Sequence, residues 1–123
     1  EDESPEVFEK YLNTLFSYAS TISLDKESKE IAKISDLKIG DIFIKAGSPG
    51  HVVLVVDVCA NENGEKAFLL GQGYMPAQSF HIIKNPLHEE NPWYFLSEFQ
   101  WPFVTQEYTF PEGSLKTLLI KTE

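Results

Sequence analysis

Arginine is absent from this chain of 123 residues, and all ten basic residues are lysines. The sequence therefore lacks the planar guanidinium fork, the side chain best suited to hold phosphates and to recognise guanine edges. A formal net charge of −9 further opposes binding to polyanions. We expect no nucleic-acid partner.

Cysteine is almost as scarce, since Cys59 is the only one. A single thiol excludes an intramolecular disulfide and a zinc site made of cysteine pairs. His51, His81 and His88 lack the spacing of metal ligands on one helix face, so we expect neither a metal nor another cofactor. The apolar runs are too short to span a bilayer, and we expect no membrane insertion.

The length suits one domain, residues 1–123. Between residues 7 and 19, apolar side chains recur every three or four positions after a Ser-Pro start, which predicts an amphipathic helix. A short helix would also suit the polar residues 25–33. Residues 41–45 and 51–58 are rich in β-branched side chains, which predicts two strands. The second run is almost continuously apolar, as expected for a strand covered on both faces.

Later segments add to an antiparallel sheet. Asn61-Glu62-Asn63-Gly64 predicts a hairpin turn, with residues 66–72 as the returning strand. We expect a fourth strand in residues 79–84, an aromatic loop over 93–103 that folds back on the core, and edge strands near 103–108 and 115–120. The predicted fold class is α+β, an N-terminal helix packed on an antiparallel sheet of about 4–6 strands.

His51 is the first candidate for chemistry. It begins the predicted strand after a glycine-rich turn and shares a face with Val53, Val55 and Asp57, because side chains alternate along a strand. An imidazole on such a rigid mount is well placed to act as a general base. A histidine that only ends a strand and hydrogen-bonds the turn is the plainer interpretation.

Residues 36–44, with Leu37-Lys38-Ile39-Gly40-Asp41 leading into a strand, are followed by Gly50-His51-Val52-Val53 and further aliphatic residues. This ordered combination resembles the NlpC-type and CHAP-type peptidoglycan amidases. The resemblance implies a papain-like half-barrel in which a histidine at the position of His51 activates a cysteine at a helix N-terminus. It also implies an orienting polar residue on the next strand, which falls at Gln72.

The nucleophile that the resemblance requires is missing. Two alignments of the N-terminal helix place its slot at Phe8 or within residues 2–4, and neither supplies a cysteine. Cys59 is about 26 Å from His51 at the rise of a strand, too far to pair with it. Ser4 is better explained as a helix cap. The sequence therefore favours a domain that is not an enzyme.

A run rich in glycine, amides and aromatics surrounds Gln72. Tyr74, Gln78 and His81 offer an aromatic face, an amide and a second imidazole, a mixture that suits peptide or sugar binding. A hydrogen-bonded turn between two strands is the alternative.

The stretches Phe8-x-x-Tyr11-Leu12-Asn13, Gly50-His51-Val52-Val53 and Gln72-Gly73-Tyr74-Met75-Pro76 also resemble an uncharacterised family of Bacteroidetes envelope proteins. Members of that family are longer, which implies that this chain is the C-terminal part of a larger protein in the cell envelope or secreted. Three hypotheses result. One is a non-catalytic domain that binds a peptidoglycan peptide or glycopeptide. The second is a peptidase or amidase with an upstream or unconventional nucleophile and His51 as base. The third is an assembly module that docks a protein partner through residues 93–103.

Overall fold

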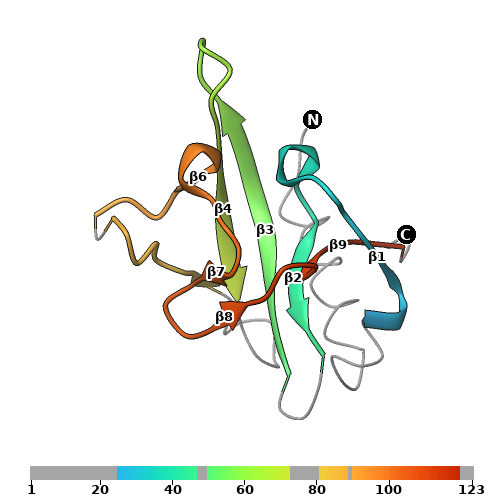
Figure 1. Cartoon of the computed structure of the whole chain (residues 1–123). Helices are drawn as coiled ribbons and strands as arrows, with labels where there is room; N and C mark the ends of the chain where they lie inside the picture. Colours follow the sequence, from blue (N-terminus) through green and yellow to red (C-terminus); the bar gives the residue numbers. More distant parts are fainter. Residues whose placement is uncertain (1–24, 47–49, 73–80, 89, 120–123) are drawn as a thin grey trace.

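The structure, a computed structural model, describes residues 25–46, 50–72, 81–88 and 90–119. Its main feature is a seven-stranded antiparallel sheet in the order β1-β9-β2-β3-β4-β5, with β6 also paired to β4, and a second sheet of two strands (Figure 1). The elements are β1 (Ser28–Glu30), η1 (Ile34–Asp36), β2 (Ile42–Lys45), β3 (His51–Ala60), β4 (Lys66–Gln72), β5 (His81–Ile82), β6 (Tyr94–Phe95), η3 (Leu96–Glu98), β7 (Phe103–Val104), β8 (Thr109–Phe110) and β9 (Leu115–Leu118).

The α+β prediction is wrong for this structure. The described residues are nearly all antiparallel sheet with short 3₁₀ turns, and they do not show a helix packed on a sheet of four to six strands or a papain-like half-barrel. Residues 28–30, within the segment expected to be a short helix, form β1 because they pair with β9. Pairing with a neighbouring strand overrides weak local preference. The helix predicted over residues 7–19 lies outside the described residues.

The predicted central hairpin is confirmed. Strands β3 and β4 pair on either side of a turn in which the Asn61 side-chain oxygen accepts hydrogen bonds from the backbone of Asn63 and Glu65, at 2.8 and 3.0 Å. Gly64 has a φ of +83°, which a side chain would strain. Val53, Leu54 and Val55 are all buried, so β3 is covered on both faces as its continuous apolar run predicts.

A β-bulge changes which side chains of β3 share a face. The register with β4 shifts between Val55 and Asp57. As a result Val58 packs against the core, while Asp57 is exposed. The expected face of His51, Val53, Val55 and Asp57 is therefore correct only for its first three members, because the extra residue at the bulge reverses the alternation.

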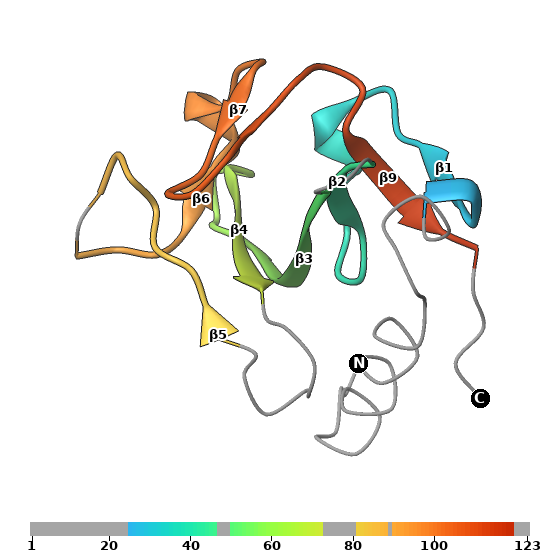
Figure 2. The same cartoon turned by 90° about the horizontal axis from the view of Figure 1, so that it is seen from below.

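Aromatic rings attach the chain from β6 to β8 to one face of the sheet. The buried ring of Phe43 on β2 lies 4.6 Å from that of Phe103 and 6.1 Å from those of Phe68, Phe99 and Phe110, measured between centroids. Figure 2 shows β6 and β7 together on one side of β4. The predicted inward folding of the aromatic loop over 93–103 is confirmed.

Buried Asp41 fixes the entry into β2. Its carboxylate accepts hydrogen bonds from the backbone N–H of Lys38 (2.8 Å) and from the Lys38 ammonium (3.1 Å), which also donates to Thr117 on β9. A charge that is almost fully buried needs such partners. The Gly-Asp step of the sequence therefore has a structural role here.

Replacing Phe43 by alanine should lower the free energy of unfolding by about 3–5 kcal/mol, because its ring is fully buried among five others. Urea denaturation followed by tryptophan fluorescence would measure the change. Ile39→Ala is the control, since Ile39 is 40% exposed, and should cost about 1 kcal/mol or less. Equal losses in the two variants would contradict the central role of Phe43.

Candidate functional site

The turn that joins β7 to β8 builds the region around the predicted site residues. Thr105 is buried within it, and its hydroxyl donates to the carbonyl of Tyr108 (2.9 Å) and accepts from the Tyr108 N–H (3.2 Å). The backbone of Thr105 also donates to the same carbonyl at 2.8 Å. These bonds close the turn and fix the directions of Glu107 and Tyr108.

His51 lies under this turn. Its imidazole stacks on the Tyr108 ring, with centroids 3.9 Å apart and planes inclined by 20°. A stacked phenol presents its face to the imidazole and not its hydroxyl, so the pair is not a nucleophile hydrogen-bonded to a base. His51 is half-buried at the start of β3, on the core-facing side with Val53.

Gln72 reaches the same turn from the neighbouring strand. Its side-chain amide donates to the Glu107 carboxylate at 2.8 Å. His81 is opposite Gln72 in the register of β4 with β5. His51 and Gln72 therefore contact two consecutive residues of one turn, Tyr108 and Glu107. His81 is next to Gln72 on the neighbouring strand.

A polar cavity of about 140 Å³ lies next to this cluster. Its described lining residues carry two amides, an imidazole, a cation and a carboxylate among isoleucines: Gln72, His81, Ile82, Ile83, Lys84, Gln106 and Glu107. Two of the predicted site residues, Gln72 and His81, thus share one cavity. His51 is not among its lining residues, and Tyr74 and Gln78 lie outside the described residues.

The site contains residues that the sequence did not single out. Gln106, Glu107 and Tyr108 belong to residues 103–108, for which the sequence predicts an edge strand. Only Phe103–Val104 of that segment is a strand, and the residues after it form the turn to β8. Nothing in the local sequence relates the turn to His51, which is more than fifty residues earlier in the chain. The contact depends on the aromatic packing that brings β7 and β8 onto the sheet.

Neither candidate nucleophile is placed beside His51 among the described residues. Cys59 is exposed and lies near the C-terminal end of β3, whereas His51 begins that strand. Ser4 lies outside the described residues. The described residues contain no group of three or more histidine, cysteine or acidic side chains that could hold a metal. None of their helices is long and apolar enough to cross a membrane.

Replacing Tyr108 by leucine should uncover one face of the His51 ring. We expect faster modification of His51 by diethyl pyrocarbonate and a downfield shift of its ring protons, because the aromatic ring current is lost. Thr109→Ala is the control, since Thr109 is exposed on the adjacent position of the chain. An unchanged His51 signal in Tyr108→Leu would show that the two rings do not stack.

Comparison with known proteins identifies a family for this chain but no individual relative. No match was found among curated proteins or among solved structures. A family model described as Domain of unknown function (4846) matches residues 1–117, which is nearly the whole chain. The chain therefore belongs to the DUF4846 family.

Proposed function

We propose that this protein is a non-catalytic binding domain that takes a peptide or glycopeptide in the polar cavity beside Gln72 and His81. The cavity itself carries the proposal, because donors and acceptors from three separate segments converge on it. Few, convergent polar groups among apolar side chains are typical of ligand sites.

The side chains at the cavity match the groups of a peptide. Gln106 and Gln72 are primary amides, which pair with peptide N–H and C=O groups or with sugar acetamides. Lys84 and Glu107 supply one charge of each sign, which suits a ligand bearing both a carboxylate and an amine. A volume of about 140 Å³ accommodates one residue or one acetamido group, so the remainder of the ligand would extend over the surface.

The position of the thiol relative to His51 supports a domain without catalysis. The His51 ring is stacked on Tyr108, and the thiol of Cys59 is at the far end of the strand. The alternative is a hydrolase that uses His51 as a base, since the stacked Tyr108 ring covers one face of the imidazole and leaves its in-plane nitrogens open. That hydrolase requires a nucleophile from elsewhere than Cys59. We therefore favour binding, and hydrolysis is one outcome of the test below.

The cell envelope is the location that we propose for this activity. The support is the resemblance of residues 36–56 to peptidoglycan amidases and of the longer motif set to envelope proteins of Bacteroidetes. Muropeptides combine the carboxylates and amines of a stem peptide with acetamido sugars, and these groups match the side chains of the polar cavity.

Binding is tested with a disaccharide-tetrapeptide muropeptide and, separately, its tetrapeptide, by mapping changes in ¹H–¹⁵N spectra. We expect saturable shifts at the side-chain amides of Gln72 and Gln106 and at His81. Gln106→Ala should weaken binding about tenfold, the effect of losing a hydrogen bond to a charged ligand. Asn63→Ala removes an exposed amide in the turn between β3 and β4, outside this cavity, and should leave the affinity unaltered. Shifts that avoid all of these positions would refute the proposal.

Hydrolysis is tested on purified peptidoglycan with the longest natural form of the protein, beside its His51→Ala variant. We expect no release of peptide from either protein. Turnover by the wild type that disappears in His51→Ala would overturn the non-catalytic assignment and support the hydrolase.

A further inference from the structure

A second cavity lies between the chain from residue 85 to 87 and the segment containing β6, η3 and β7. Its volume is about 220 Å³, and it shares no described lining residue with the polar cavity. The walls are mainly apolar, with four aromatic rings: Tyr94, Phe95, Phe99 and Phe103. Nothing in the proposed function accounts for this cavity.

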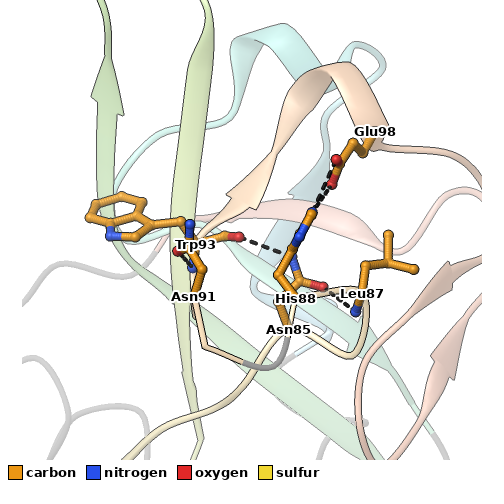
Figure 3. Close-up of polar contacts among 6 residues, drawn as sticks. All are labelled: Asn85, Leu87, His88, Asn91, Trp93 and Glu98. Carbon is orange, nitrogen blue, oxygen red and sulfur yellow. Dashed lines mark hydrogen bonds and ion pairs between the residues drawn. The ribbon is translucent and has the colours of Figure 1, made fainter.

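Buried Asn85 shapes one wall of the cavity (Figure 3). Its amide donates to the carbonyl of Trp93 at 2.9 Å, and its oxygen accepts from the backbone N–H of Leu87 at 2.9 Å. The Tyr94 hydroxyl donates to the carbonyl of Lys84 at 2.7 Å. Because the polar groups of this wall are tied to one another, the cavity is formed before a ligand arrives.

Glu98 gives the cavity its charge. It is the one charged side chain among the described lining residues. Its carboxylate oxygens lie 2.8 and 3.0 Å from Nε2 of His88, and the Glu98 side chain is 40% exposed (Figure 3). One imidazole N–H leaves acceptor capacity on both carboxylate oxygens. A cation at the rim would therefore meet an accessible carboxylate on a protein with a net charge of −9.

The volume of the cavity and the exposed apolar side chains at its rim indicate the size and kind of ligand that would fit. A cavity of about 150 Å³ holds one benzene ring, so about 220 Å³ holds a single aromatic or branched side chain with a short stem. At the rim, Leu87 is 70% exposed and Val104 is 51% exposed. These side chains extend the apolar surface beyond the cavity, where a small molecule would leave it uncovered and a polypeptide would bury it.

We propose that the apolar cavity is a docking site for a partner polypeptide, which inserts one aromatic side chain and places an adjacent lysine or arginine on Glu98. The aromatic ring meets the four rings of the wall, and the neighbouring cation meets the carboxylate. This partner site is separate from the peptide-binding cavity, and either can exist without the other.

Three short peptides test the proposal on the wild-type protein. Acetyl-Gly-Lys-Phe-Gly-amide should give saturable ¹H–¹⁵N shifts at Leu87, Glu98 and Val104. Replacing its lysine by glutamate should weaken binding about tenfold, and replacing its phenylalanine by alanine should abolish it. Equal binding of the lysine and glutamate peptides would overturn the charge assignment, and shifts elsewhere would overturn the site.

Charge reversal provides the matched variants. Glu98→Lys should reverse the preference, so that the glutamate peptide binds more tightly than the lysine peptide. Glu112→Lys makes the same change at an exposed position outside the cavity and should keep the wild-type preference. Because Glu98 is partly exposed, the variant should keep the wild-type pattern of core resonances. An unreversed preference in a folded Glu98→Lys variant would refute the role of Glu98.

Phenethylamine separates a polypeptide partner from a small amine. It carries the ring and the cation without a peptide backbone, so it should bind at least tenfold more weakly than the lysine peptide. Binding as tight as that of the peptide would overturn the polypeptide assignment. Failure of muropeptide binding at the other cavity leaves these outcomes unaffected.

Discussion

The packing of aromatic rings around Phe43 is the constraint on which the rest of the molecule depends. It holds the chain from β6 to β8 against the sheet through Phe99, Phe103 and Phe110. Both cavities are made by that chain, since β6, η3 and β7 wall the apolar one and the turn before β8 walls the polar one. The segments that line the cavities are thus held on a rigid hydrophobic core, and binding residues are commonly found on loops positioned in this way.

A single tyrosine lies between the two cavities. Tyr94 lines the apolar cavity, stacks on Phe68 at 5.5 Å and donates its hydroxyl to the carbonyl of Lys84, a residue that lines the polar cavity. Burial raises the pKa of the Tyr94 phenol well above its ordinary value, so the group remains a proton donor under all physiological conditions. The protonated phenol can therefore donate to the carbonyl of Lys84, and this hydrogen bond links a lining residue of one cavity to a lining residue of the other.

The sequence revealed the local elements of the fold but not its long-range assembly. Strands β2 and β3 follow from runs rich in β-branched residues, and β4 follows from the hairpin turn at Asn61 and Gly64. The bulge beside Val56 has no such signal, and it alone moves Asp57 off the expected face. Strand alternation places His51 on the side of the core, yet only tertiary packing brings Tyr108 onto its ring. Short strands such as β1 are set by their partners, which local propensity cannot identify.

The position of β9 has a consequence for how the chain acquires its structure. This strand lies between β1 and β2, although it follows them by about 85 and 70 residues. During synthesis, β1 cannot pair with β9 until residues 115–118 have left the ribosome. The β3–β4 hairpin, by contrast, pairs locally and can form early. Until β9 arrives, the backbone edge of β2 lacks the pairing that β9 supplies, and an unpaired edge makes a nascent or shortened protein prone to aggregation.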